Sequence, residues 1–334
     1  MRLGVHVSIA GGLPEAVARA QRLSCTTMQI FSRSPRGGAA PALSEEDVRR
    51  FDAGRAAAGI DPLAVHSPYI INLASPEPAM WTQSLRLYRD EYARAARLNA
   101  DYLVTHVGSH RGQGEAGGIA RVAEAVAQTL AGATPTTMIL LENTAGSGQG
   151  LGFQFEQLAA IRAAVPLKRH VGICLDTAHL FGAGYPIHTA EGLEQTLASF
   201  DRAVGHEHLK LIHLNDSKAA FNSRVDRHWH IGQGHIGLEA FRRIVNHPKL
   251  ADVPFILETP KTTARPGSGE GRAGDAEDQR NLKTVRCLVP PSERPPSGSP
   301  RSAGREGDRP RSRRDSASTP GRHRGRALAG HDRG

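Results

Sequence analysis

Imidazole and carboxylate side chains recur in this chain where apolar, strand-like runs end. Nine of these residues could ligate metal ions: His66, His106, Glu142, Asp176, His179, His213, Asp226, His228 and Glu258. A single histidine is usually structural, but recurrence at the ends of six separate runs is not something that packing requires. Such ends converge on one site when the strands form a closed parallel barrel. The pattern therefore predicts one shared metal centre.

The donor types indicate the metal and its chemistry. Five histidines and four carboxylates without a thiolate suit zinc and are tolerable for manganese or iron. A catalytic zinc usually takes about three protein ligands and a water, so nine ligands predict two or three ions with one bridging carboxylate. Clustered cations lower the pKa of a bound water toward about 7 and neutralise charge during phosphoryl displacement. The set therefore favours hydrolysis of an anionic phosphodiester.

The elements that must position these donors alternate regularly along the chain. Eight apolar runs predict strands at 3–9, 26–32, 63–67, 102–108, 137–143, 171–177, 209–215 and 254–259. Amphipathic segments predict helices at 13–23, 44–58, 79–98, 115–131, 154–164, 190–203, 237–247 and 275–288. Continuous apolar runs are typical of parallel strands covered on both faces, and helix-length connections supply the crossovers. We therefore predict an α/β fold, a (β/α)8 TIM barrel in one domain over residues 1–290, with a long Gly/Pro-rich loop at 265–275.

The candidate ligands fall at the expected end of this barrel. Predicted strands three to eight end at or near His66, His106, Glu142, Asp176, His213 and Glu258. Asp176 and His179 are three apart across a strand-to-helix transition, close enough to serve one cluster. Asp226 and His228 are two apart, so an extended segment would point both to one side and Arg227 to the other.

Neighbouring polar residues have more ordinary interpretations. His6 ends the first predicted strand and is interpreted as structural, with a role behind the ligands as the alternative. Asn143 and Asn215 are expected to orient ligands through hydrogen bonds. The glycine-rich stretch 145–152 lacks the spacing and the GK[ST] of a phosphate-binding loop, so we interpret it as a connection between strand and helix.

Charge and composition set the cellular context. The net charge is +9, and residues 291–334 contribute six of these charges through eleven Arg and five acidic residues. This tail is rich in Arg, Ser, Pro and Gly, and we predict that it is disordered. A DNA-binding arm is the alternative to a dispensable extension. Three dispersed cysteines and no long apolar segment predict a cytoplasmic protein without a membrane span, and we expect a monomer.

Several motifs together resemble the endonuclease IV family of apurinic/apyrimidinic endonucleases. They are GVHVSIAGGL, VHSPYIINLASP, THVGSH, LLENTAGSGQGLGF, GICLDTAHLFGAGY, HLNDSKAAFNSRVDRHWHIGQGHIG and ILETPK. The resemblance runs from residue 3 to about residue 289 and includes all nine candidate ligands in order. It implies cleavage of double-stranded DNA on the 5′ side of an abasic site, which leaves a 3′-hydroxyl and a 5′-deoxyribose phosphate, and removal of 3′-blocking groups.

The resemblance also implies a barrel that holds three zinc ions, with manganese possible at some sites. His66 and His106 would hold one ion, and Glu142 would bridge it to a second ion that also takes Asp176, His213 and Glu258. His179, Asp226 and His228 would hold the third ion. Glu142 and Glu258 would be catalytic, the latter by orienting or deprotonating the attacking water.

The same resemblance assigns DNA contacts to Arg36 and Tyr69, and the residue types suit those roles. A guanidinium can hold phosphate, and an aromatic ring can fill the gap left by a missing base. Arg227 is a further candidate for a phosphate contact. The family often has an aromatic residue shortly after the arginine, whereas this chain has Gly37 and Gly38, which removes a stacking group from this loop.

Two other classes of function remain open from the residues alone. A sugar isomerase or epimerase uses the same barrel and a metal at the strand ends, but it needs fewer ligands than this chain offers. A non-catalytic DNA-binding module would use the basic tail and would not turn over a substrate. A count of bound metal ions separates the first alternative, and a cleavage assay separates the second.

Overall fold

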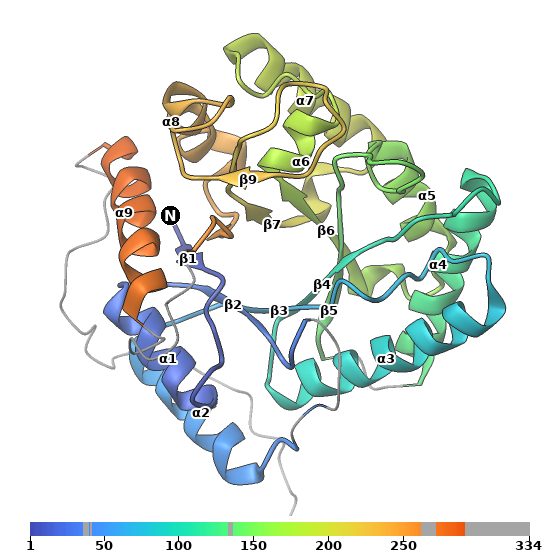
Figure 1. Ribbon diagram of the computed structural model, residues 1–334, viewed down its shortest axis with the longest axis horizontal. Coiled ribbons are helices and arrows are strands. Elements are labelled where there is room, and N and C mark those ends of the chain that lie inside the picture. The colour runs from blue at the N-terminus through green and yellow to red at the C-terminus, as the bar shows by residue number, and fades with distance from the viewer. Residues whose placement is uncertain (36–39, 41, 133–135, 262–271, 291–334) are drawn as a thin grey trace, which may run out of the picture. The chain divides into compact units, whose positions relative to one another are not determined.

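The computed structural model describes residues 1–35, 40, 42–132, 136–261 and 272–290 of this chain (Figure 1). Arg36, Gly37 and Gly38 lie outside the described residues, as does the predicted tail at 291–334. The predictions for those residues therefore stay predictions.

Eight parallel strands form the barrel that the sequence predicts. They are β1 (Leu3–Val5), β2 (Met28–Phe31), β3 (Leu63–His66), β4 (Tyr102–His106), β5 (Met138–Glu142), β6 (Val171–Asp176), β7 (Leu209–His213) and β10 (Phe255–Leu257). Their order is β1-β10-β7-β6-β5-β4-β3-β2, in which each strand pairs in parallel with its neighbours. The seam between β1 and β2 closes through a parallel bridge between His6 and Gln29, where the Val7 amide donates to the Gln29 carbonyl at 2.8 Å.

Helices surround this barrel (Figure 1). They are α1 (Leu13–Arg22), α2 (Glu45–Ala58), α3 (Pro78–Arg97), α4 (Glu115–Ala131), α5 (Phe155–Ala164), α6 (Thr177–Gly182), α7 (Ala190–Ala203), α8 (Leu238–Val245) and α9 (Arg272–Leu288). Eight of them correspond to predicted helices. Within the described part of the chain, no helix has both the length and the apolar character needed to span a bilayer.

Three features differ from the sequence prediction. The short helix α6 was not predicted, because six residues directly after a strand carry too little periodic signal. The two-stranded hairpin of β8 (Asp216–Ser217) and β9 (His228–Trp229) was not predicted either. The loop prediction for 265–275 is wrong at its end, since α9 begins at Arg272; the rest of that stretch, 265–271, lies outside the described residues.

The barrel interior is filled with side chains, so it is a core and not a pore. One cluster inside it consists of Ala64, Val104, Leu140, Cys174, Leu211 and Ile256, all of which are buried. At the seam, a Cβ on Gly4 would lie 1.9 Å from the carbonyl oxygen of Thr27, so only glycine permits this approach of β1 to β2. Because the interior is packed, polar side chains can gather only at the mouth, where the strands end.

Candidate metal centre

The barrel brings all nine predicted ligands together at its carboxyl end. Strand register explains part of this, since His106 pairs with Glu142 across β4 and β5, and Asp176 pairs with His213 across β6 and β7. Three groups of candidate ligands have their donor atoms within 4.8 Å of one another: His66, His106 and Glu142; Glu142, Asp176, His213 and Glu258; and Asp176, His179 and His228. Glu142 and Asp176 are each shared by two groups, which joins the three groups into one cluster.

Glu142 lies between two sets of imidazoles. Its Oε2 is 3.1 Å from Nε2 of His66 and 3.0 Å from Nε2 of His106. Its Oε1 is 2.9 Å from Nδ1 of His213. The two oxygens thus face different neighbours, as a bridging carboxylate requires.

Asp226 joins the third group from outside the barrel strands. Its Oδ2 is 3.1 Å from Nε2 of His179, and its Oδ1 is 3.3 Å from Nε2 of His228. Asp226 belongs to the loop after β8, and His228 begins β9. These two donors therefore come from the hairpin and not from the end of a barrel strand, and both face His179 as the extended spacing predicts.

In three of these histidines, the imidazole nitrogen that faces away from the cluster is bonded to a backbone carbonyl oxygen. Nδ1 of His66 is 2.7 Å from the carbonyl oxygen of Ser67, and Nδ1 of His179 is 2.9 Å from the carbonyl oxygen of Asn143. Nδ1 of His228 is 3.2 Å from the carbonyl oxygen of Glu258. A carbonyl oxygen only accepts, so these nitrogens carry a proton, and the other nitrogen is the one that could bind a metal ion.

Two asparagines orient the carboxylates, as the sequence predicts. The Asn215 amide donates to Oδ2 of Asp176 at 2.6 Å, and its oxygen accepts from the backbone N–H of Glu258 at 2.7 Å. The Asn143 oxygen accepts from the backbone N–H of Asp176 at 2.6 Å. The Asp176 carboxylate also caps α6 by accepting from the backbone N–H of His179 at 2.8 Å, which fixes the helix that carries this ligand.

Gln29 was missed by the sequence reasoning and lies at the centre of this network. It is fully buried on β2, a strand that supplies none of the nine ligands. Its Oε1 is 2.9 Å from Nε2 of His213, and its Nε2 donates to Oε1 of Glu258 at 2.6 Å. Nδ1 of His6 lies 2.9 Å from Gln29 Nε2 and 3.2 Å from Glu258 Oε1. His6 therefore contacts a candidate ligand from behind, which favours the alternative interpretation of His6 over a purely structural one.

The pKa values of the cluster depend on a balance between burial and neighbouring charges. Burial would raise the pKa of Glu142, but the neighbouring His106 and His213 hold that pKa well below its usual range. Burial opposes the ionisation of Asp226 as well, yet His179 lowers its pKa to about 2. The pKa of His179 rises in turn to about 10, because Asp176 and Asp226 outweigh its burial. Glu142 and Asp226 therefore stay ionised and need positive charge beside them, which protons or metal cations can supply.

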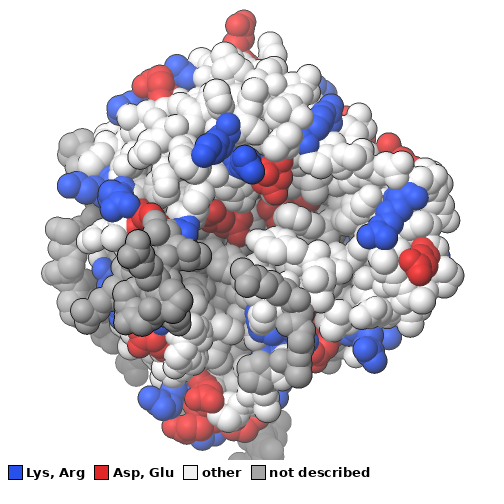
Figure 2. Space-filling model, viewed as in Figure 1, with Lys and Arg blue, Asp and Glu red and all other residues white. Residues whose placement is uncertain are grey.

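A cavity of about 420 Å³ opens over the cluster and is lined by His66, Tyr69, His106, His179, Asp226, His228 and Glu258. Acidic side chains lie within the hollow of this face, and Lys and Arg side chains lie around it (Figure 2). Tyr69 stands at the rim with 60% of its surface exposed, and its ring centroid is 5.5 Å from that of His66. Phe31, which the sequence reasoning also missed, packs at 5.5 Å against both of these rings.

The predicted DNA contacts are only partly described. Tyr69 lies over the candidate ligands, whereas Arg227 is exposed on the segment between Asp226 and His228. Arg36 lies outside the described residues, so its prediction is not tested by the structure.

Comparison with known proteins places this geometry in a family. Residues 17–284 match the model for xylose isomerase-like TIM barrels. The chain is 46% identical over 289 residues to a probable endonuclease 4 of Chloroflexus aurantiacus, with 86% of this chain and 98% of that protein covered. The crystal structure of endonuclease IV from Thermus thermophilus is 39% identical with a TM-score of 0.74, and the match covers 86% of this chain and 98% of that one.

The barrel and the candidate ligands at its mouth thus define a xylose isomerase-like TIM barrel protein with a candidate metal centre. A D-psicose 3-epimerase from Clostridium cellulolyticum has the same fold, with a TM-score of 0.58 over 86% of this chain and 99% of that one, but its identity of 17% supports the fold alone. The chain belongs to the endonuclease IV family, which confirms the resemblance carried by its motifs.

Proposed function

We propose that this nuclease of the endonuclease IV family hydrolyses the phosphodiester on the 5′ side of abasic sites in double-stranded DNA. A 3′-hydroxyl and a 5′-deoxyribose phosphate would remain, and 3′-blocking groups would be removed by the same centre. The observation that carries this proposal is the set of three ligand groups joined through Glu142 and Asp176 beneath an open cavity. Family membership and these groups indicate a metal-dependent enzyme.

We assign about three zinc ions to the centre, because each of the three groups offers the number of protein ligands that zinc takes. The first group is His66, His106 and Glu142, and the second is Glu142, Asp176, His213 and Glu258. The third is His179, His228 and Asp226, with Asp176 beside it. Manganese is a possible replacement at some sites, since the donors are nitrogen and oxygen only. When bound, such ions activate water and neutralise the phosphate.

The residues of the chain have separable parts in this reaction. Glu142 is completely buried and holds two groups of histidines in register. Glu258 lines the cavity and its side chain is 11% exposed, so it can contact the attacking water, which it would orient or deprotonate. We propose that Tyr69 contacts the DNA at the gap left by the missing base. We propose phosphate contacts for Arg227 and Arg36.

The decisive experiment uses a duplex oligonucleotide with a single abasic site, incubated with and without a chelator. We expect one cut on the 5′ side, a product with a 3′-hydroxyl, and no cleavage once the chelator is present. Metal analysis of the purified chain should give about three ions. Cleavage on the 3′ side, or full activity after complete metal removal, would contradict the proposal.

The Glu258→Gln variant tests the catalytic assignment. We expect a loss of turnover of about 100-fold or more, with binding of abasic duplex largely retained, because general acid–base groups contribute about that much. Glu156→Gln is a matched control, since Glu156 is exposed on α5, away from the cavity. Cleavage by Glu258→Gln at the rate of this control would remove Glu258 from the mechanism.

A sugar isomerase remains the second candidate only through the shared fold. An isomerase would need one or two ions, so it would not require the third group of ligands, to which the hairpin contributes Asp226. Metal analysis that gives a single ion, together with isomerisation of a ketose and no cleavage of abasic DNA, would favour it.

A further inference from the structure

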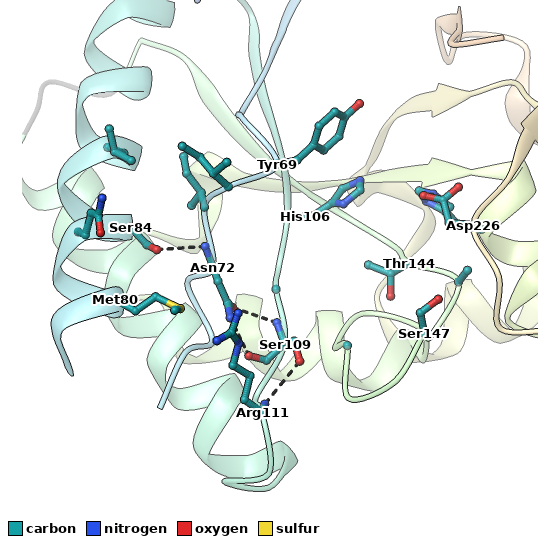
Figure 3. Close-up of a pocket in the computed structure, with 18 residues that line it drawn as sticks. Tyr69, Asn72, Met80, Ser84, His106, Ser109, Arg111, Thr144, Ser147 and Asp226 are labelled. Carbon is teal, nitrogen blue, oxygen red and sulfur yellow. Dashed lines mark hydrogen bonds and ion pairs between the residues drawn. The ribbon is translucent and has the colours of Figure 1, made fainter. Parts of the chain in front are cut away.

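A groove leads out of the metal centre between α3 and the loops that follow β4 and β5. Its volume is about 710 Å³, and it shares Tyr69, His106, His179 and Asp226 with the cavity over the candidate ligands. Tyr69, His106 and Asp226 lie at one end of it, and Arg111 lies at the other (Figure 3). The groove is therefore a continuation of the proposed active site.

The two walls of this groove differ in chemistry. The β3–α3 connection and α3 supply apolar side chains, with Ile71, Met80 and Leu87 among them. The loops after β4 and β5 line the opposite side with polar residues, including Ser109 and Ser147, whose hydroxyls donate to the backbone carbonyl oxygens of Gln149 and Arg224 (Figure 3). The faces of bases are apolar and the sugar-phosphate backbone is polar, so an apolar wall opposite a polar one matches the two sides of a nucleotide strand.

Hydrogen bonds fix the floor of the groove before any ligand enters. Asn72 Nδ2 donates to the carbonyl oxygen of Ser109 at 3.0 Å, and the Ser109 backbone N–H donates to Asn72 Oδ1 at 3.0 Å. The Asn72 backbone N–H also donates to the Ser84 hydroxyl at 3.1 Å, which ties the same residue to α3 (Figure 3). A Cβ at Gly108 would lie 2.2 Å from Asn72 Oδ1, so glycine is needed there. A preformed groove loses little entropy when it binds.

Arg111 provides the positive charge of this groove. It is the only Lys or Arg among the described lining residues, and its side chain is exposed. Its φ of 44° is in the left-handed region, an unfavourable conformation for an arginine that the surrounding loop maintains. Within the described part of the chain, no acceptor forms a hydrogen bond or ion pair with its guanidinium. The only carboxylate lining the groove in the same described part is Asp226, at the metal end.

We infer that this groove binds the part of the damaged strand that continues from the scissile phosphodiester, and that Arg111 binds one phosphate of that part. The inference rests on the proposed function. The volume is typical of a site for a ligand the size of one or two nucleotides, so a single strand and not the whole duplex enters the groove. A guanidinium can bind phosphate through two parallel hydrogen bonds, which fixes the strand as well as attracting it.

The first test is the Arg111→Gln variant, with Arg86→Gln as the matched control. Arg86 is exposed on α3 and lies outside the groove, and within the described part of the chain it has no ion pair. For Arg111→Gln we expect KM for abasic duplex to rise about three- to tenfold while kcat stays unchanged, because a phosphate contact adds uniform binding. The slope of log(kcat/KM) against log[salt] should become shallower by about 0.9, and Arg111→Lys should recover part of the loss. The control should leave KM unchanged.

A second test identifies the phosphate that Arg111 contacts. A series of abasic duplexes carries one neutral methylphosphonate at a time, on either strand and on either side of the lesion. At one position on the damaged strand, the methylphosphonate should lower kcat/KM for the parent enzyme and for Arg86→Gln. It should lower kcat/KM no further for Arg111→Gln, because that variant has already lost the contact.

The outcomes separate this inference from the proposed function. If the parent cleaves the abasic duplex but no position depends on Arg111, or the dependent position lies on the undamaged strand, the groove inference is wrong and the proposed function stands. If the parent cleaves no abasic duplex, both are wrong.

Discussion

Replacement of Gln29 by leucine should weaken metal binding without touching a ligand. Gln29 Oε1 accepts from His213 Nε2, so the proton of that imidazole is held there and Nδ1 faces the cluster, 2.9 Å from Glu142 Oε1. The amide nitrogen must be the group near Glu258, because a carboxylate oxygen can only accept from it at 2.6 Å. Leucine has a similar volume and removes both contacts.

The magnitude follows from what the substitution leaves behind. The His213 Nε2–H loses the acceptor that Gln29 provides, and Glu258 loses a donor on the oxygen that His6 also approaches. Both groups lie deep in the barrel mouth, where an unsatisfied polar group costs about 1–3 kcal/mol. Loss of a partner behind a metal ligand typically weakens metal affinity about 10- to 100-fold, which corresponds to about 1.4–2.7 kcal/mol. The two values agree.

The assay is zinc retention during titration with a chromophoric chelator, followed by metal analysis. We expect Gln29→Leu to release at least one ion at about 10- to 100-fold less free chelator than the parent. Gln157→Leu is the matched control, since Gln157 is also buried but lies in α5. Its Oε1 accepts from the Gly152 N–H at 2.7 Å. It should lower the melting temperature and leave zinc retention unchanged. Parent-like retention in Gln29→Leu, with only a lower melting temperature, would refute this reasoning.

Three further predictions concern the rim, the core and the last helix. Tyr69→Ala should reduce the preference for abasic over intact duplex about tenfold or more in a binding assay, because a stacked ring contributes about 1–3 kcal/mol. Its zinc content should not change, and an unchanged preference would exclude the stacking role. Leu140→Ala, inside the barrel, should lower the free energy of unfolding by about 2–5 kcal/mol, measured in urea at fixed zinc. A loss below about 1 kcal/mol would mean that neighbouring side chains move to fill the cavity. Burial raises the pKa of Asp278 from 3.8 to about 6 despite its ion pair with Lys261 at 2.7 Å, so its contribution to stability is full below about pH 4 and is lost as the pH rises through 6. Asp278→Asn should therefore raise the free energy of unfolding more at pH 8 than at pH 5, by about 1.4 kcal/mol, because one pH unit separates pH 5 from the raised pKa of about 6. An equal gain at both pH values would contradict the raised pKa.

The sequence predicts the barrel and most of its centre for a simple geometric reason. Buried parallel strands are continuous apolar runs, so their ends are visible in the sequence, and the carboxyl ends of all eight strands meet at one mouth. A residue such as His106 or Glu142 is therefore located in space once its strand is recognised. The family resemblance adds the grouping of ligands, which strand ends alone do not determine.

Residues outside this rule could not be located from the sequence. The hairpin that carries His228 has strands of two residues each, too short for an alternating pattern, and its position depends on long-range contacts such as that of His228 Nδ1 with the carbonyl oxygen of Glu258. The groove depends on Asn72, whose amide bonds to a residue 37 positions away. Gln29 had a usable signal, because a polar side chain inside the buried run of β2 needs a partner. Nothing in the sequence indicates which partner that is.

Closure of the barrel and orientation of the ligands depend on the same residue. The seam between β1 and β2 is narrow, with its bridge between His6 and Gln29 and with Gly4 against the backbone of Thr27. Gln29 is bound to the seam through its backbone and to His213 and Glu258 through its side chain. A change that widens the seam must therefore move the amide that holds both ligands. Strands that carry no candidate metal ligand thus contribute to the candidate centre, and weaker metal binding would report on barrel closure as well as on the candidate ligands themselves.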